Sequence, residues 1–503
     1  MADLSNAFKL SNCGQALLAK LGSDVVSFLG TTVYQSSNET YFSKQNSDLQ
    51  PHCILSPRSA QEVSDILTTA LPIFKPPHAS DRFEYCPIAI RSGGHFFPTG
   101  SSNIENGITI DLRHLNSINV HEDQQIVSIG PGATWGDVYA KLDPLHLSVA
   151  GARAAQVGVG GISVGGGISF FSTQHGWTCD SLIRAEVVLS DGRILVADEE
   201  NHPELLIALR GGGGNLGIVT RLDFRMFKQG LVWGGHVFQS VETIEGQIKA
   251  LSAMSTETFH EGQARGYDEN AAIIMSFGFA AGRGAVVVNN MVYADSDSLE
   301  KDGEKVKPPG TFQPFLELPQ IFDTLRVAPL HDISIELGSY SPSGKRQLRL
   351  VTTHDTLETM LNAVYQRWNT SLDSIRNVPG IVWAVSLEPL PAALYKQATK
   401  NSLGLEETNN SLMITLLSAT WDNPADDVKV ERTAKTLFAA IEEDSHRLGA
   451  HHPFIYLNYA APWQDPIASY GSESIERIRR VSREVDPQGA FFRMMPSRFK
   501  IPE

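Results

Sequence analysis

The sequence lacks any hydrophobic run long enough to cross a membrane, because no stretch of its 503 residues approaches the roughly 18 apolar residues that a spanning helix needs. The N-terminal segment also lacks the apolar core of a secretory signal, so we expect a cytoplasmic protein, or a secreted one if the sequence is a mature form. Basic residues are in deficit, with 41 Lys and Arg against 56 Asp and Glu and a net charge of −15. Nucleic acids and anionic membranes attract positive surfaces, so neither is an expected partner.

Cysteine is scarce, and the four cysteines, Cys13, Cys53, Cys86 and Cys179, form no Cys-x-x-Cys pair. This spacing argues against a structural zinc site. We expect buried free thiols, although the first three cysteines lie in one N-terminal stretch and a disulfide among them is the alternative. The adjacent pair His451-His452 does not indicate a metal site, because neighbours on a strand point to opposite faces and no third ligand has suitable spacing.

A Walker A loop is absent, because no Gly-Lys-Ser or Gly-Lys-Thr follows any glycine cluster. The 42 glycines concentrate between Gly93 and Gly217. Gly212-x-Gly214-x-x-Gly217 matches a dinucleotide fingerprint, but residues 218–227 alternate with a period of two, as in a strand, whereas a Rossmann site needs a helix there. The glycine clusters are therefore either tight turns of a β-rich domain or loops that approach a long, phosphate-containing cofactor, and composition leaves both open.

The pattern of apolar residues predicts a mixed α and β chain. We expect helices over residues 59–71, 134–142, 356–368 and 427–448, and strands over 87–91, 107–112, 125–129, 284–293 and 411–421. Ser59 and Glu62 have capping-box spacing, and Asp191-Gly192 suits a type I′ turn between strands at 185–189 and 193–197. The polar stretch 296–314 is predicted to be a solvated insertion. The loss of glycine clusters beyond residue 228 predicts domain boundaries near 228 and 450.

Several motifs occur in a characteristic order along the chain. The first half contains Arg91-Ser-Gly-Gly-His95, Gly107-Ile-Thr-Ile-Asp-Leu112, Gly130-Pro-Gly-Ala-Thr-Trp-Gly136, Val157-Gly-Val-Gly-Gly161, Gly165-Gly-Gly167 and Leu209-Arg-Gly-Gly-Gly-Gly-Asn-Leu-Gly-Ile-Val-Thr220. The C-terminal part contains Tyr456-Leu-Asn-Tyr459, Tyr470-Gly471 and Asp486-Pro-Gln-Gly-Ala-Phe-Phe-Arg493. Over residues 50–228 and 450–500 this set resembles the vanillyl-alcohol oxidase-type FAD-binding superfamily, and specifically its berberine bridge enzyme-like branch.

The resemblance implies an α+β fold, in which a two-part FAD-binding domain carries an inserted substrate domain with an antiparallel sheet flanked by helices. We expect the FAD-binding domain in residues 1–228 and 450–503 and the substrate domain in residues 229–449. By resemblance, the residues expected to bind FAD are Arg91, Ser92, Gly93, Gly94, His95, Gly158, Gly160, Gly161, Gly165, Gly166, Asn215, Gly217, Ile218, Val219 and Asn458.

The resemblance also assigns chemistry to single residues. His95 is expected to form a covalent bond to the flavin, which retains the cofactor and raises its redox potential. Many members form a second bond through a cysteine, but Ala154 stands at that position and Cys179 follows the glycine motif, so we expect a monocovalent flavin. Tyr459 is the candidate catalytic base, because the strand expected at 411–421 has no acid, and we favour a role outside the site for Glu388.

The implied function is that of an FAD-linked oxidase. It would transfer a hydride from a small organic substrate, a secondary-metabolite alcohol or phenol, to the flavin, with O2 as acceptor and H2O2 as by-product. The alternatives are a flavin-containing cyclase of secondary-metabolite biosynthesis, a sugar oxidase, or a protein that retains FAD without turnover. The sequence does not specify the substrate or the oligomeric state.

Overall fold

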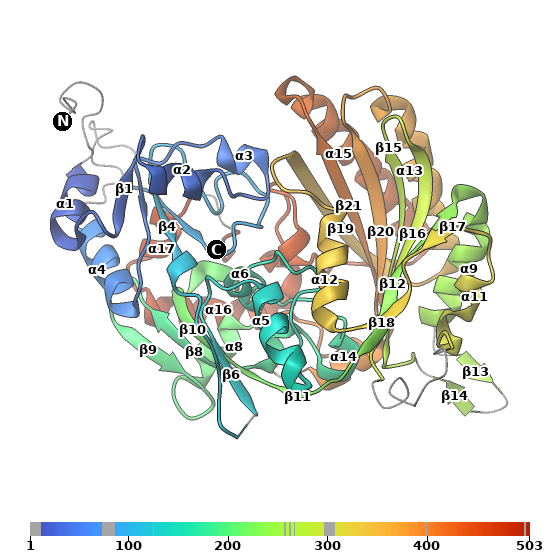
Figure 1. Ribbon diagram of the computed structural model, residues 1–503, viewed down its shortest axis with the longest axis horizontal. Helices are drawn as coiled ribbons and strands as arrows, with labels where there is room; N and C mark the ends of the chain where they lie inside the picture. Colours follow the sequence, from blue (N-terminus) through green and yellow to red (C-terminus); the bar gives the residue numbers. More distant parts are fainter. Residues whose placement is uncertain are drawn as a thin grey trace.

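The chain forms two adjoining parts, one with small sheets and one built on a large sheet (Figure 1). The computed structural model describes residues 12–72, 86–123, 125–255, 258–260, 263–265, 267–295, 307–398, 400–496 and 499–502. Helices lie against sheets in which most strand pairs are antiparallel, which confirms the predicted α+β class. Within these ranges, no helix combines the length and the apolar character that membrane crossing requires.

The first sheet comes from the N-terminal part of the chain. Its strands have the order β1 (Val26–Phe28), β2 (Cys53–Leu55), β4 (Ile108–Asp111) and β3 (Ile88–Arg91). Beside it lie α1 (Asn12–Leu21), α2 (Thr32–Asn38), α3 (Lys44–Ser47) and α4 (Ala60–Ala70). β2, β4 and β3 are parallel, whereas β1 is antiparallel to β2. The helix predicted at 59–71 and the strands predicted at 87–91 and 107–112 are confirmed.

The caps of two helices differ from each other. Ser59 caps α4, because its hydroxyl accepts a hydrogen bond from the Glu62 backbone N–H at 3.2 Å. The Glu62 carboxylate accepts from the N–H of Arg58 instead of Ser59, so the predicted capping box is only half formed. A complete box, formed by Thr134 and Asp137, begins the predicted helix α5 (Trp135–Leu142).

A second sheet is antiparallel and has the order β5 (Ile118–Val120), β6 (Ile126–Ile129), β10 (Ile218–Arg225), β8 (Leu182–Val188) and β9 (Ile194–Ala197). β10 begins directly after Gly217, so a strand and not a helix follows the glycine motif, as predicted. The β8–β9 hairpin is confirmed, but its turn is not type I′, because Gly192 has φ +85° and Asp191 does not have positive φ. β7 (Leu147–Ser148) pairs with β11 (Phe227–Lys228).

The large sheet is antiparallel throughout. Its order is β17 (Gln320–Asp323), β12 (Val232–Ser240), β16 (Gly284–Tyr293), β15 (Ala271–Ala280), β20 (Val382–Leu390), β21 (Leu412–Trp421), β19 (Arg346–Asp355) and β22 (His451–His452), with β18 (Arg326–Ala328) also paired to β12. The strands predicted at 284–293 and 411–421 are confirmed. A separate hairpin joins β13 (Thr258–His260) and β14 (Gln263–Arg265).

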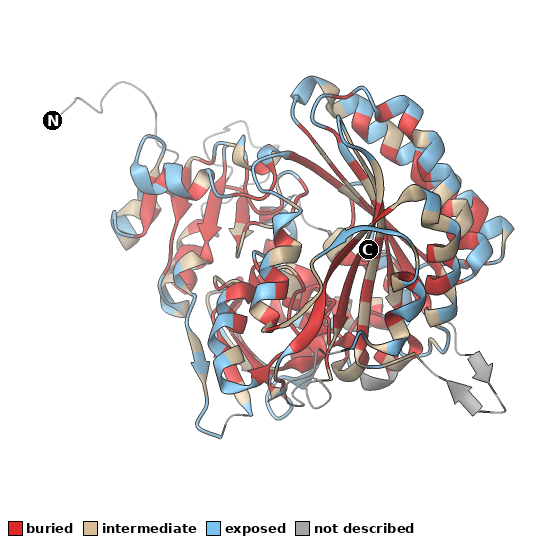
Figure 2. Cartoon of the chain, turned by 45° about the vertical axis from the view of Figure 1, so that its right-hand side comes forward, coloured by how far each residue is buried: buried red, intermediate tan, exposed pale blue. Residues whose placement is uncertain are grey.

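Helices cover one face of the large sheet, and Figure 2 shows their exposed outer sides. They are α9 (Ile244–Ser255), α11 (Gln313–Leu316), α13 (Glu358–Ile375) and α15 (Asp427–Arg447). Trp368 fixes α13 to the sheet, since its indole N–H donates to the carbonyl of Trp383 at 3.1 Å. α13 extends beyond the predicted residue 368 because Leu372 and Ile375 continue its buried stripe.

The remaining helices connect the two parts. They are α6 (Val159–Val164), α7 (Ser172–His175), α8 (Pro203–Leu209), α12 (Leu330–Ser339), α14 (Ala392–Gln397), α16 (Gly471–Val485) and α17 (Ala490–Met494). α16 packs on α8, and Phe491 and Met494 of α17 share a core with Ile88 and Ile108. The C-terminus therefore packs against the N-terminal sheet.

The predicted solvated insertion is only partly accessible to comparison. Residues 296–306 lie outside the described residues. In the described part, Lys307, Pro308 and Gly310 are exposed as predicted, but Phe312 is buried, as is Phe315 just beyond the stretch. They pack in one core with Trp233, Ile248 and Leu251, so this end of the stretch contributes to the fold.

Cysteine pairing also departs from the expectation. Cys13 and Cys86 form a disulfide across a sequence separation of 73 residues, whereas Cys53 and Cys179 are buried free thiols. The expectation of free thiols is thus confirmed for two cysteines and wrong for the other two. The disulfide connects α1 to the residues just before β3, two segments that only the fold brings together.

We predict that Cys86→Ser lowers the unfolding free energy by about 2–4 kcal/mol, because the unfolded chain loses the constraint of a long closed loop. The measurement is thermal unfolding without reductant. The parent protein serves as its own control, since added dithiothreitol should lower its melting temperature toward that of the variant and leave the variant unchanged. A parent whose melting temperature does not respond to dithiothreitol would contradict the prediction.

Candidate active site

A cavity of about 400 Å³ lies between the glycine-rich loops and the face of the large sheet that the helices leave open. This volume is within the usual range of roughly 300–1,000 Å³ for ligand pockets. Strand alternation supplies the sheet wall, because Met275, Phe277 and Leu387 face the helical core while Ser276 and Glu388 line the cavity. The cavity thus faces both parts of the chain.

Most residues predicted to bind FAD come together on the lining of this cavity. They are Ser92, Gly93, Gly94, His95, Gly158, Gly160, Gly161, Asn215, Gly217, Ile218, Val219 and Asn458. The predicted base Tyr459 also lines it, in a 3₁₀ turn over Leu457–Tyr459.

Two loops of this wall touch through their backbones. A Cβ atom at Gly93 would lie 2.6 Å from Cα of Gly158, and one at Gly158 would lie 2.3 Å from N of Gly93. Ser92 strengthens the contact, since its hydroxyl donates to the carbonyl of Pro131 at 2.5 Å and accepts from the N–H of Gly160 at 3.1 Å. Only glycine permits this approach at positions 93 and 158, and the wall presents backbone to the cavity.

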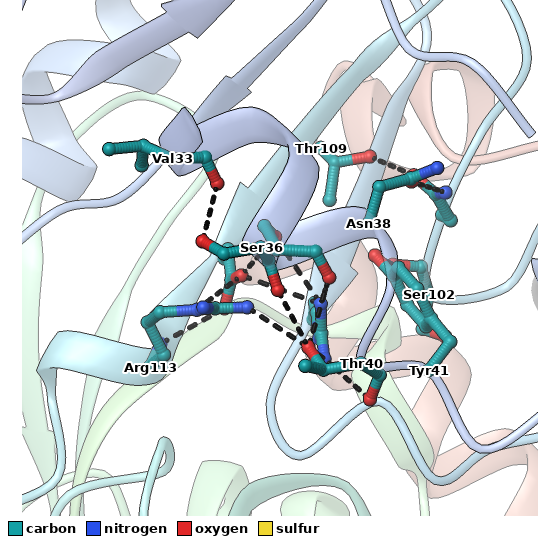
Figure 3. Close-up of polar contacts among 12 residues, drawn as sticks. Val33, Ser36, Asn38, Thr40, Tyr41, Ser102, Thr109 and Arg113 are labelled. Carbon is teal, nitrogen blue, oxygen red and sulfur yellow. Dashed lines mark hydrogen bonds and ion pairs between the residues drawn. The ribbon is translucent and has the colours of Figure 1, made fainter. Parts of the chain in front are cut away.

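Arg91 lies outside the lining, contrary to its predicted role in binding FAD. Its guanidinium points behind the loop, where it donates to the hydroxyl of Thr40 at 2.7 Å and lies 3.6 Å from the Asp111 carboxylate. It also lies over the ring of Tyr41, 4.0 Å from the centroid. Figure 3 shows Thr40, Tyr41 and Arg113 in this network. Arg91 supports the loop that carries His95.

Gly165 and Gly166 also lie outside the lining. The Gly165 carbonyl accepts a hydrogen bond from the Asn458 side-chain amide at 3.1 Å, and a Cβ atom there would lie 2.3 Å from Oδ1 of Asn458. Gly166 has φ +105°, a conformation that favours glycine. These glycines position Asn458, which lines the cavity, instead of lining it themselves.

His95 faces the cavity and stacks on Phe42, with ring centroids 3.9 Å apart. Burial and the nearby Arg349 lower the pKa of His95 to about 3. Its imidazole is therefore neutral at pH 7, with a nitrogen lone pair free for bonding. Ala154 lines the same cavity, and among the described residues no cysteine does. Cys179 is buried elsewhere, and burial raises the pKa of its thiol well above the usual value.

A buried polar cluster stands at Tyr459. Arg153 donates from Nη2 to the Glu388 carboxylate at 2.6 Å and to the Tyr459 hydroxyl at 2.6 Å. The Tyr459 hydroxyl in turn lies 3.4 and 3.5 Å from the two Glu388 carboxylate oxygens, to which it can donate. Burial raises the pKa of Tyr459, and Arg153 opposes this effect. The phenol is therefore protonated near neutral pH.

The sequence interpretation missed two members of this cluster. Glu388 is 3% exposed and lines the cavity from β20, so the expectation that it lies outside the site is wrong. β20 is paired with β21, so Glu388 lies on the strand next to the one in which the sequence analysis expected a catalytic acid. Arg153 is 9% exposed. The sequence contains a sign of its role, because it is a lone arginine in the segment 150–155, whose other residues are alanine and glycine. An arginine in such surroundings needs a buried anionic partner.

Known proteins resemble this chain in sequence and in structure. Residues 51–198 match the family described as FAD binding domain. The chain is 34% identical over 501 residues to Oligopeptidase PhomG' of Diaporthe leptostromiformis, covering 98% of this chain but only 38% of that protein. It is 32% identical over 476 residues to FAD-dependent monooxygenase FUP4 of Fusarium proliferatum, covering 92% of this chain and 87% of that one.

Among solved structures, glucooligosaccharide oxidase from Acremonium strictum has a TM-score of 0.74 and 19% identity, covering 98% of this chain and all of the other. Its flavin is a 6-S-cysteinyl, 8α-N1-histidyl FAD. Fold, cavity and relatives together define an FAD-dependent oxidoreductase. The chain belongs to one family of FAD-binding oxidoreductases with the Fusarium FAD-dependent monooxygenase, and it shares its fold with a berberine bridge enzyme-like protein of Physcomitrella patens and with a xylooligosaccharide oxidase of Myceliophthora thermophila.

We predict that Gly158→Ala impairs FAD retention, because the added methyl group collides with the backbone of Gly93. Overpacking of this kind typically costs about 1–3 kcal/mol. The measurement is flavin absorbance per purified protein, with melting temperature alongside. Gly310→Ala is the matched control, since a Cβ atom at this exposed residue meets nothing within 4 Å. Equal flavin content in both variants would contradict the prediction.

Proposed function

We propose that this protein is an FAD-linked oxidase that acts on a small organic substrate, an alcohol or phenol of secondary metabolism, with O2 as electron acceptor and H2O2 as by-product. The observation that carries the proposal is the Arg153–Glu388–Tyr459 cluster on the lining of a cavity that the glycine loops and His95 also line. Such a cluster can remove a proton from a hydroxyl group while a hydride leaves the adjacent carbon.

The residues present fit FAD. The touching loops at Gly93 and Gly158 leave a backbone-lined wall without side chains, which suits a long dinucleotide. Ser92, Gly94, Asn215 and Asn458 would hold it there. When bound, FAD supplies the acceptor for the hydride that leaves the substrate carbon.

The protein's own residues handle the proton. A substrate hydroxyl placed against the Tyr459 oxygen can pass its proton to Tyr459 as the phenolic proton moves to Glu388, which is the carboxylate within 3.5 Å. Arg153 holds both oxygens by hydrogen bonds and balances the negative charge. Tyr459 thus acts as the base with Glu388 as the final proton acceptor.

We further propose a single covalent link through His95. The neutral imidazole on the cavity lining and the Ala154 side chain nearby on the same lining support this proposal. The Acremonium oxidase has a cysteinyl and a histidyl bond, whereas the described lining here offers a histidine without a cysteine.

Two further predictions from the sequence, the domain boundaries and the location in the cell, remain proposals. We keep the division into 1–228, 229–449 and 450–503. It is supported by the large sheet, whose strands lie within 229–449 except for β22 just past the boundary, and by the packing of α17 in the N-terminal core. We keep a cytoplasmic location as the proposal, with secretion as the alternative. The Cys13–Cys86 disulfide favours an oxidising compartment.

A monooxygenase is the second candidate, because relatives such as the Fusarium protein have that name. Screening of metabolites with the purified yellow protein would decide between the two. Stoichiometric peroxide and bleaching of the flavin absorbance without oxygen support the oxidase. Incorporation of isotopically heavy molecular oxygen into the product supports the monooxygenase. Product formed with an unchanged flavin spectrum would instead indicate a cyclase.

We predict that acid precipitation of the parent protein leaves the flavin in the pellet and that His95→Ala releases it to the supernatant, because the variant has no nitrogen to form the bond. Proteolysis followed by mass spectrometry should give one flavin-bearing peptide, and it should contain His95. A flavin-bearing peptide with Cys179 would contradict the single link, and quantitative release of FAD from the parent would contradict any link.

We predict that Tyr459→Phe and Glu388→Gln each slow flavin reduction by about 10²–10⁴-fold, since both remove a step of the same proton transfer. The double variant should be no slower than about the worse single variant, because the two residues act as a unit. The measurement is anaerobic stopped-flow reduction, with flavin content and melting temperature as controls. Multiplicative effects in the double variant would show that the two residues act independently.

A further inference from the structure

Arg349 lines the cavity but takes no part in the proposed proton transfer. It lies on β19, between Leu348 and Leu350, which pack into the helical core, so strand alternation directs Arg349 to the cavity. Its guanidinium has three aromatic neighbours, with the rings of Phe42, Tyr459 and Phe97 centred 5.2, 5.7 and 5.9 Å away. Cation–π contacts of this length contribute only weak stabilisation.

Arg349 also lacks a polar partner in the part of the chain that the structure describes. No hydrogen bond or ion pair reaches its guanidinium there, whereas Arg153, the other arginine of the lining, is bonded to Glu388 and Tyr459. Burial lowers the pKa of Arg349 from its usual value, and the nearby Tyr459 and Glu388 only partly oppose this effect. A half-buried, fork-shaped cation of this kind, facing a cavity, is a site for a planar oxyanion.

The charge balance of the cavity leads to the same conclusion. The charged side chains of its described lining are Arg153, Arg349 and Glu388. Arg153 and Glu388 neutralise each other at 2.6 Å, so one positive charge is left over. It belongs to the sheet wall, and Phe42, the ring on which His95 stacks, is one of its neighbours.

The other residues of the sheet wall indicate what kind of molecule fits beside Arg349. Ile274 and Leu416 are apolar, the hydroxyls of Ser276 and Ser386 are bonded to each other at 2.7 Å, and Ser418 adds one further hydroxyl. The hydroxyl pair therefore offers the ligand few free polar groups. A flat, largely apolar body with one acidic group matches this wall better than a sugar, which needs many hydrogen-bond partners.

We infer that Arg349 binds a carboxylate of the substrate, so that the substrate is a hydroxyl-bearing aromatic or polycyclic acid. This inference rests on the proposed function, whose proton-transfer cluster lies beside Arg349. Tyr459 is shared between the two sites: its hydroxyl belongs to the cluster and its ring lies over the guanidinium. The acid group and the reacting hydroxyl therefore lie on the same side of the bound molecule.

Binding of matched probes tests the inference without turnover. Benzoate, cinnamate and naphthoate are titrated into the FAD-loaded full chain by calorimetry, each against its neutral amide. We expect the parent to prefer at least one acid over its amide by about ten- to a hundredfold. Arg349→Gln should abolish this preference and leave the affinity for the amide unchanged. Arg349→Lys should restore part of it, because the charge remains without the bidentate fork.

Arg283→Gln is the matched control, since Arg283 is an exposed arginine in the turn between β15 and β16 of the same sheet. It should keep the parental preference. The inference is overturned if no acid is preferred by the parent, or if the preference persists in Arg349→Gln. If the acid preference persists in Arg349→Gln and the flavin midpoint potential of this variant is shifted, then the partner of Arg349 is the cofactor and not the substrate.

The outcome is separable from that of the proposed function. Suppose that the acid preference depends on Arg349, but that none of the substrates tested reduces the flavin and no peroxide forms. This outcome would uphold the binding site and reject the oxidase. Oxidase activity on neutral alcohols with unchanged kinetics in Arg349→Gln would do the reverse. If Arg349→Gln does not fold, the comparison of Arg349→Lys with the parent carries the same test, with a loss of acid affinity and none of amide affinity expected.

Discussion

The ion pair between Arg153 and Glu388 joins the two parts of this molecule. The residues are 235 positions apart in sequence, one in a glycine-rich loop and one on the large sheet, and both are nearly inaccessible to solvent. Loss of either partner would leave the other charge buried and unpaired, which typically costs about 3–5 kcal/mol. This contact helps to hold the two walls of the cavity together, alongside others such as the ion pair between Arg346 and Asp48 at 3.3 Å. The same contact orients the Tyr459 hydroxyl, so architecture and chemistry depend on one arginine.

The large sheet serves two purposes through the alternation of its side chains. One face is covered by helices and supplies a dry core around Trp368 and Trp383. The other face has serine hydroxyls, one carboxylate and one arginine, and it remains open to the cavity. A strand whose side chains point alternately to the core and to the cavity does not have a uniformly apolar sequence. β21 illustrates the consequence, since Leu417 enters the core while Ser418 reaches the cavity.

The sequence predicted the backbone of the site better than its side-chain chemistry. Glycines at 93 and 158 mark positions where backbone must approach backbone, and such a requirement is visible in composition. Arg91 belongs to the same motif, yet only the fold shows that it points toward Thr40 and Asp111. Glu388 was misjudged for a related reason, because its relation to Tyr459 depends on which strands become neighbours. The disulfide is likewise a consequence of tertiary contact, which spacing alone does not determine.

The order in which the cavity is assembled has a consequence for biosynthesis. The glycine loops end at Val219, but Asn458 and Tyr459 follow only about 240 residues later. At typical synthesis rates of roughly 5–20 residues per second, these segments leave the ribosome on the order of 10–50 s apart. During that interval the first wall has neither its facing sheet nor the asparagine that completes it. Stable cofactor loading therefore follows synthesis of the segment around Asn458, and a half-formed cavity is exposed to chaperones and to aggregation until then.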